Sequence, residues 1–294
     1  MHALQGLSQR LKVVIAAFLL VGSLAACSSN QQTAQVGPED PGWFGPDNDP
    51  LEFINRFTFA FNDALDTVLF QPAAATYRVI VPKPVRNGVR NVLRNLNGPV
   101  ILANDLLQGE WDRASDTFMR FVINSTIGVA GIFDIAAEWG YEYHDEDFGQ
   151  TLGSWGVGEG FYLVLPLLGP SSARDTVGIV VDSYMDPWSY VLDWGTRLSD
   201  TDITYIMIGR RGLEGLDMRS RNIETIESIK KDAVDYYARI RTLYRQNRES
   251  EIRNGAPEEI PVPGVSEQDW QRQVEPSAEL LTPYTGQKSS LPTD

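Results

Sequence analysis

The chain has little of what catalytic metal sites and nucleotide-binding loops are built from. Its 294 residues include one cysteine and two histidines, so it can form no intramolecular disulfide and cannot supply the several histidine or cysteine ligands that zinc sites use. None of its lysines follows a glycine. This excludes the Gly-Lys-[Ser/Thr] sequence of a Walker phosphate-binding loop. We therefore expect no metal and no nucleotide cofactor.

Positive charge and long apolar runs are also scarce. Lysine and arginine number 25 against 39 aspartates and glutamates, which gives a net charge of −14. Binding to a nucleic-acid backbone depends on clustered basic residues, so a nucleic-acid partner is not expected. Beyond residue 27 no apolar run reaches the 18 or more residues of an ordinary transmembrane helix. Amphipathic helices could still lie in a membrane interface.

Residues 1–26 have the features of an export signal. Arg10 and Lys12 precede the apolar run VVIAAFLLVGSLAA, which is too short to span a bilayer. The run ends at Leu-Ala-Ala followed by Cys27, which resembles a bacterial lipobox, whose cysteine carries a diacylglycerol after cleavage; a lone free or buried thiol is the alternative. Lipoproteins held at the inner membrane typically have aspartate after that cysteine, whereas Ser28 stands here. The outer membrane is therefore the expected location.

The exported chain divides into three parts. Residues 27–48 are polar and contain glycine and proline, which is typical of a tether. Residues 49–248 carry helical patterns and predict one mainly α domain, large enough for a core. Residues 249–294 are acidic and rich in proline, with too little apolar content to repay the entropy of ordering, so we expect a disordered tail.

The first predicted helix begins at Asp49 to Glu52, where the sequence DPLE resembles a capping box. Apolar residues then recur at steps of three and four, which indicates a helical face. They are Ile54, Phe57, Phe61, Leu65 and Val68. Phe53 and Phe59 widen this apolar arc beyond one seam. Two interpretations stay open, namely core packing and a helix lying against lipid.

Two further helices are predicted between residues 84 and 140. In the first, Arg86, Arg90 and Arg94 recur every four residues beside an apolar stripe. These arginines form either a solvated face or a surface that attracts anionic lipid head groups. The second helix is loosened by Gly128 and Gly131. Small residues at such spacing allow helices to approach closely.

Five glycines fall within FGQTLGSWGVGEG, residues 148–160. Gly156, Gly158 and Gly160 give G-x-G-x-G, whereas a dinucleotide-binding turn needs G-x-G-x-x-G. Leu152 stands where a nucleophile elbow would need a glycine two residues before its serine. The glycines are therefore expected to permit positive φ in turns.

The glycine-rich segment leads into the apolar residues 161–168, which contain Pro166. Proline has no backbone N–H and interrupts a helix, so this residue excludes both a central strand and a continuous helix here. We expect a short irregular apolar hairpin or edge segment.

His144 is the one histidine of the exported part and lies in the acidic sequence YEYHDEDFG. A hydrolase could pair it with Ser154, Ser171 or Ser172, although no local nucleophile motif supports this pairing. The acids at 145–147 could contact Ca²⁺ loosely, but a solvated acidic loop is the simpler interpretation.

Four blocks of the sequence resemble the MlaA (VacJ) family of outer-membrane lipoproteins. They are DPLEFINRFTFAFN, PVRNGVRNVLRNL, RFVINSTIGVAGIFDIAAEWG and FGQTLGSWGVGEGFYLVLPLLGPSSARDTVG, and the match covers about residues 49 to 245. The resemblance implies a ring-like helical domain with amphipathic interfacial helices, seated in the inner part of the outer membrane and associated with trimeric porins. Through its central channel, misplaced phospholipids would leave the outer leaflet for a soluble periplasmic carrier.

Under this interpretation the protein is not an enzyme, and particular residues acquire roles. Those expected to line or gate the channel are Gly149, Gly153, Gly156, Gly158, Gly160, Tyr162, Pro166, Arg174 and Asp175. Those expected in the first interfacial helix are Phe53, Phe57, Phe61 and Asn62. Cys27 is the expected lipidation site, and no residue is assigned to catalysis. A phospholipase-like hydrolase and a porin-bound scaffold that transports nothing are the alternatives.

Overall fold

The computed structural model describes residues 49–196 and 198–255, and this part is mainly α-helical, as predicted. The predicted signal sequence, Cys27, the predicted tether and the residues beyond 255 lie outside the described residues. The helices are α2 (Glu52–Leu65), the π-helix η1 (Asp66–Phe70), α3 (Gln71–Ile80), α4 (Lys83–Gln108), α5 (Trp111–Thr126), α6 (Ile135–Glu138), α7 (Phe148–Ser154), α8 (Ala173–Met185), α9 (Pro187–Gly195), α10 (Asp200–Arg221), α11 (Ile223–Asp232) and α12 (Tyr236–Ile252). The strands β1 (Tyr162–Leu165) and β2 (Gly169–Ser172) pair antiparallel.

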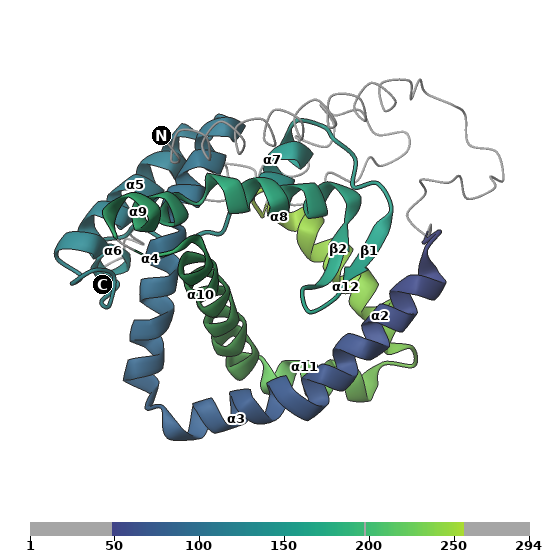
Figure 1. The fold of residues 1–294 in the computed structure, drawn as a ribbon. Coiled ribbons are helices and arrows are strands. Elements are labelled where there is room, and N and C mark those ends of the chain that lie inside the picture. Colours follow the sequence, from purple (N-terminus) through teal and green to yellow (C-terminus); the bar gives the residue numbers. More distant parts are fainter. Residues whose placement is uncertain (1–48, 197, 256–294) are drawn as a thin grey trace, which may run out of the picture. The chain divides into compact units, whose positions relative to one another are not determined.

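Within residues 49–255 the elements follow one another around a closed circuit of contacts (Figure 1). From α2 the circuit passes to β1 and β2, then to α8, α7 and α4. α4 packs against α10, α10 against α3, and α3 returns to α2 through η1. α12 packs against both β2 and α7, while α5 packs against α4. This circuit is the ring-like arrangement that the resemblance implied.

Buried apolar side chains lie in small clusters, because a closed circuit offers no common centre in which they could gather. The cluster where α7 meets α8 comprises Phe148, Leu152 and Val181. The cluster where the hairpin meets α12 comprises Tyr162, Val164 and Tyr237. Polar contacts between elements must therefore contribute much of the specificity of the fold.

The start of α2 differs from the predicted capping box. Leu51 occupies the N-cap position, and no side chain caps the helix. The carboxylate of Asp49 instead accepts a hydrogen bond from Asn55 Nδ2 at 2.7 Å, and it also accepts from side chains of α12. Glu52 pairs with Arg56 at 2.6 Å. The capping prediction is wrong because Asp49 is bonded to Asn55 and to side chains of α12, and Glu52 to Arg56 one turn further along α2.

The C-terminal end of the domain also differs from the prediction. α12 continues to Ile252, past the predicted domain end at residue 248. Arg248 and Glu251 form an ion pair at 3.0 Å within this last turn. The acidic composition after residue 248 therefore does not mark the end of the helix.

A buried polar joint connects α4, α7 and α8. Asn104 of α4 donates from Nδ2 to Asp182 Oδ1 at 3.1 Å and accepts at Oδ1 from Thr151 Oγ1 at 2.8 Å. Asp182 also accepts from the backbone N–H of Phe148, the first residue of α7, at 3.0 Å. Burial raises the pKa of Asp182 to about 6, since these hydrogen bonds offset only part of the desolvation of the carboxylate.

Asp182→Asn should change how stability depends on pH. The ordinary pKa of this carboxyl is 3.8, and folding raises it to about 6, so the wild-type protein loses stability as the pH rises through this window. The loss at pH 7 is about 2 to 3 kcal/mol, at about 1.4 kcal/mol per pKa unit. The variant lacks this loss. The free energy of unfolding is measured in urea at pH 4 and pH 7 in one detergent. The difference between variant and wild type should shift in favour of the variant by about that amount from pH 4 to pH 7. A difference that stays constant with pH would contradict this account.

Candidate functional site

The outer edge of β1 is completed by an asparagine side chain of α2. Asn55 donates from Nδ2 to the backbone oxygen of Tyr162 at 2.9 Å. Its Oδ1 accepts from the backbone N–H of Val164, also at 2.9 Å. Asn55 is itself buried and is oriented by Asp49. The amide thus acts as a further peptide group on the strand edge, whose backbone groups would otherwise be buried without partners.

Asn62 repeats the arrangement at the turn of the hairpin. It donates from Nδ2 to the backbone oxygen of Leu165 and accepts at Oδ1 from the N–H of Leu167, both at 2.9 Å. Asn55 and Asn62 are two helical turns apart, so they lie on one face of α2. We call these two side chains the asparagine clamp.

Aromatic side chains of α12 cover the start of β1. The ring of Tyr162 is buried, with its centroid 6.1 Å from that of Tyr237 and 5.9 Å from that of Tyr244. Both pairs are edge to face, a favourable aromatic geometry. Tyr162, which we predicted to line or gate a channel, therefore lies in a core cluster and fixes β1 to α12.

Asp175 collects hydrogen bonds where α8 begins. Its backbone N–H donates to Ser172 Oγ at 3.1 Å, which caps the helix. Its carboxylate accepts from Arg248 Nε at 2.9 Å, from Arg174 Nε at 3.0 Å and from the hydroxyl of Tyr244. Burial alone would raise the pKa of Asp175, but the two guanidinium groups and the hydroxyl outweigh it and hold the pKa below its usual value. The charged carboxylate ties α8 to α12.

Glycines let α7 approach α8 and α12 closely. A Cβ on Gly178 would lie 2.5 Å from the backbone nitrogen of Gly149, and a Cβ on Gly149 would lie 2.6 Å from Asp175 Oδ1. A Cβ on Gly153 would lie 2.8 Å from Ile252. Gly149 and Gly153 lie in α7. They serve close packing, so the expectation that all five glycines act in turns is wrong for these two.

The remaining glycines of the segment differ in their backbone. Gly156 has φ +84° and Gly160 has φ +69°, a region in which residues with a Cβ are strained. These two confirm the expected role in turns. Gly158 has no positive φ, and nothing lies within 4 Å of an added Cβ there.

The apolar segment that follows forms a more regular hairpin than we predicted. β1 and β2 pair through a complete antiparallel register, with Pro166 just beyond the last paired residue of β1. Pro166 therefore interrupts no ladder hydrogen bond, which reconciles a proline with an ordered strand. Leu167 and Leu168 lie exposed at the tip.

The outer side of α2 and η1 exposes large apolar side chains. Phe53 is 87% exposed, Phe57 73% and Val68 79%, and Phe61 is exposed as well. The core-packing interpretation of this face is therefore wrong. Such an apolar surface is typical of helices that lie in a membrane interface. Among the described residues, no helix combines the length and the apolar character that crossing a bilayer requires.

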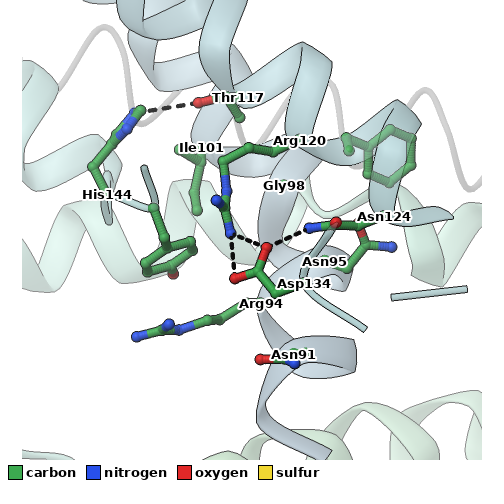
Figure 2. A pocket seen from close by; sticks show the side chains of 12 residues that line it. Asn91, Arg94, Asn95, Gly98, Ile101, Thr117, Arg120, Asn124, Asp134 and His144 are labelled. Atoms are coloured by element: carbon green, nitrogen blue, oxygen red, sulfur yellow. Dashed lines mark hydrogen bonds and ion pairs between the residues drawn. The ribbon is translucent and has the colours of Figure 1, made fainter. Parts of the chain in front are cut away.

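A polar pocket lies between α4, α5 and the segment 134–144 (Figure 2). Within it Arg120 Nη2 donates to both oxygens of Asp134 at 2.9 Å, and Asn124 adds a third hydrogen bond at 2.9 Å. Arg94 of α4 also lines the pocket, and in Figure 2 its guanidinium points away from Asp134. The one carboxylate of the pocket is thus already paired.

His144 does not meet the serines that a hydrolase would need. Its Nε2 lies 3.0 Å from Asp105 Oδ1 and 3.2 Å from Thr117 Oγ1. Ser154 Oγ donates to a backbone oxygen within α7, and Ser172 caps α8. The arrangement lacks the nucleophile-to-base contact of a triad.

The acidic segment after His144 is not the solvated loop that we expected. Glu146 is buried and pairs with Arg113, while Asp147 caps α7 by accepting from the N–H of Gln150 at 3.0 Å. Over residues 49–196 and 198–255 no three His, Cys, Asp or Glu side chains gather in a way that could hold a metal ion.

The structure brings the predicted site residues together in two places and leaves a third group apart. Gly149, Gly153, Arg174 and Asp175 lie at the α7–α8–α12 junction, and Asn62, Tyr162 and Pro166 lie at the hairpin. The exposed phenylalanines of α2 form a separate surface. Sequence reasoning missed Asn55, Gly178, Tyr244 and Arg248. A signal existed for the first, because an asparagine two turns before Asn62 interrupts an apolar arc.

Comparison with known proteins identifies relatives over most of the chain. A family model described as MlaA lipoprotein matches residues 47–251. The intermembrane phospholipid transport system lipoprotein MlaA of Haemophilus influenzae is 33% identical over 250 residues, covering 83% of this chain and 92% of that protein. The protein of the same name from Escherichia coli K12 is 33% identical over 222 residues, covering 73% of this chain and 83% of that protein.

A solved structure is similar in fold as well as in sequence. It is described as "Structural basis for maintenance of bacterial outer membrane lipid asymmetry" and matches with a TM-score of 0.61 at 31% identity. The match covers 70% of this chain and 99% of that chain.

Gly178→Ala should destabilise the protein by roughly 2 to 4 kcal/mol, because the new methyl group would collide with the backbone of α7, which cannot move aside as a side chain can. Gly209→Ala in α10 is the matched control, since nothing lies within 4 Å of its added Cβ. The control should gain about 0.5 to 1 kcal/mol from helix propensity. Urea unfolding of both variants measures this. Equal stabilities would rule out the close approach of α7 and α8.

Asn55→Ala should free the edge of β1. It leaves the Tyr162 oxygen and the Val164 N–H buried without partners, at a cost of about 2 to 4 kcal/mol. Hydrogen exchange should show faster exchange at the Val164 amide. Asn247→Ala is the control, since its exposed amide bonds only to Glu251 in the next turn of α12. Unchanged protection of the Val164 amide would contradict the clamp.

Proposed function

Because the chain belongs to the MlaA lipoprotein family, we propose that it transports phospholipids at the outer membrane of a Gram-negative bacterium and so maintains lipid asymmetry. In this function it takes misplaced phospholipids from the outer leaflet and passes them to a soluble periplasmic carrier. The observation that carries the proposal is the exposed apolar face of α2 and η1. A surface of this kind favours contact with lipid.

Two features would hold the protein at the membrane. The first is the apolar face, whose transfer from water is favourable by about 25 cal/mol per Å². The second is lipidation at Cys27, which lies outside the described residues. Acyl chains contribute about 0.8 kcal/mol per buried methylene, and stable anchoring takes two or more chains or signals. Together they would place the domain against the periplasmic side of the outer membrane.

The circuit of helices would shelter the lipid during transfer. A phospholipid that crosses water exposes two acyl tails, about 30 methylenes at about 0.8 kcal/mol each, which amounts to roughly 20 kcal/mol. An amphipathic channel bounded by the circuit would remove most of this barrier without bond-making chemistry. The partners that we propose, as the family resemblance implies, are a trimeric porin in the membrane and a soluble carrier in the periplasm.

We place the gate of the channel at the hairpin. Its tip is apolar and exposed at Leu167 and Leu168, and the segment before it turns at Gly156 and Gly160. The ring of Tyr162 and Asn55 hold the start of β1, and Asn62 holds the tip through Leu165 and Leu167. The joint that Arg174 and Asp175 form with α12 would keep the base of the gate fixed, and Asn62 would have to release the tip for the gate to open.

Gly156→Val should disturb lipid transport, whereas Gly158→Val should not. Both positions have room for a side chain, but a β-branched residue is strained at the φ of +84° of Gly156, whereas Gly158 lies outside this positive-φ region. The measurement is the phospholipid content of the outer leaflet in cells that express each variant at the wild-type level. Only the Gly156 variant should change it. Wild-type lipid content with the Gly156 variant would count against a gate at this hairpin.

The same cells separate the alternative functions. A hydrolase would release lysophospholipid, and the release would stop in His144→Ala. A scaffold that transports nothing would leave outer-leaflet phospholipid unchanged when the whole chain is deleted, provided that porin levels stay normal. Accumulation of intact phospholipid on deletion supports transport.

A further inference from the structure

Three arginines of α4 lack the carboxylate partners that the other arginines have. Over residues 49–196 and 198–255 every arginine forms an ion pair with a carboxylate except Arg86, Arg90, Arg94 and Arg239. Arg239 is an exposed residue of α12, whereas the three on α4 are half-buried. In a chain with 39 acids and 25 bases, unpaired cations in such positions need an explanation.

The three side chains form one row. They are spaced by four residues, so they lie on one face of α4 and span about 12 Å at 1.5 Å per residue. We call Arg86, Arg90 and Arg94 the arginine row. Burial lowers the pKa of Arg94, and the nearby charge of Arg90 lowers it further. Like charges held together and partly desolvated are unfavourable unless an anion joins them.

Neighbouring residues hold the guanidinium groups of Arg90 and Arg94 in place, and some N–H donors of the row have no hydrogen-bond acceptor. Arg94 lies over the ring of Tyr143 at 4.1 Å from its centroid, a cation–π contact that leaves the edge of the guanidinium free. Arg90 donates from Nη2 to Asn87 Oδ1 at 3.3 Å. The Nε atoms of Arg86 and Arg90 are buried and have no hydrogen-bond partner. A guanidinium in this state is suited to a bidentate oxyanion.

The arginine row extends along α4 from the polar pocket toward α3, which packs against α10. At one end Arg94 lines the pocket of Figure 2, where Arg120 already neutralises Asp134. At the other end Arg86 lies in the first turn of α4, close in the chain to the end of α3 at Ile80. The row therefore follows α4 along a stretch of the circuit that includes α3 and α10.

We propose that the arginine row binds the phosphate group of the phospholipid that the protein transports. This inference rests on the proposed function and adds to it the part of the substrate that is recognised. A protein with a net charge of −14 repels a lipid phosphate in general. A row of cations without carboxylates offers the phosphate successive sites, while the acyl tails follow apolar surface. Every glycerophospholipid carries this phosphate, so the row selects phospholipid over neutral lipid and does not select one head group.

The test compares Arg86→Gln/Arg90→Gln/Arg94→Gln with the control Arg239→Gln. Glutamine keeps length and polarity and removes the charge, and the triple variant loses no ion pair. Native mass spectrometry of the detergent-extracted full chain measures the Kd for phosphatidylglycerol and for diacylglycerol with the same acyl chains. The triple variant should bind phosphatidylglycerol at least about tenfold more weakly, since losing even one charge-assisted hydrogen bond weakens binding by about that factor. Its affinity for diacylglycerol should stay unchanged, and Arg239→Gln should behave as wild type.

Other outcomes overturn the inference in distinguishable ways. If the triple variant loses affinity for phosphatidylglycerol and diacylglycerol equally, the arginines support the fold, and the thermal unfolding midpoint of the triple variant checks this. If Arg239→Gln lowers the affinity for phosphatidylglycerol as much as the triple variant does, the lipid responds to the net charge of the protein and not to the arginine row. Displacement of phosphatidylglycerol by millimolar inorganic phosphate would identify a free-anion site. If the wild-type protein binds no phospholipid, the proposed function itself is wrong. If the triple variant binds phosphatidylglycerol as tightly as wild type does, only the inference about the arginine row is wrong.

Discussion

The hydrogen bonds between the asparagine clamp and the edge of β1 are the joint on which the closed circuit depends. A helix interior has no free backbone groups to offer a strand, because its own N–H and C=O groups are already paired. The side-chain amide of asparagine carries both a donor and an acceptor, so it can stand in for a peptide group. Asn55 and Asn62 do this twice on one face of α2, which leaves the opposite face of the helix free for Phe53 and Phe57.

At the other joints too, a few specific side chains fix how two elements meet, but through different interactions. Gly149 and Gly178 remove side chains so that two helices can touch through their backbones, and Asp175 then ties this pair to α12 through charged hydrogen bonds. Because the apolar clusters are small, these contacts fix the angles between elements. Apolar side chains that a compact core would bury instead remain exposed, where they can contact lipid. The absence of a common core in the described part of the chain thus accounts both for the polar joints of the fold and for its apolar surface.

The arginines also contribute to these joints, because most of them form ion pairs with carboxylates. Where elements meet, arginines are matched by carboxylates, as Arg210 is by Asp186 and Arg219 by Asp66. The arginine row departs from this pattern along α4, and the unmatched charge is where an anionic substrate would be accommodated. A passage for phospholipid has to accommodate a charged phosphate and apolar acyl tails. In our proposal these two tasks are separate, with cations on one face of α4 and aliphatic side chains at the hairpin tip.

Periodicity in the sequence determined the helices and their amphipathic faces, and the block of residues 148–178 indicated the family, because local spacing and specific motifs are properties of the chain alone. Only the tertiary structure decided which faces are covered. Phe59 and Phe57 belong to one apolar arc in sequence, yet the first packs against Tyr236 and Tyr237 while the second is exposed. Likewise Asn55 acquires its role from a strand more than a hundred residues away. Such partners are set by the closure of the circuit, and no local pattern encodes them.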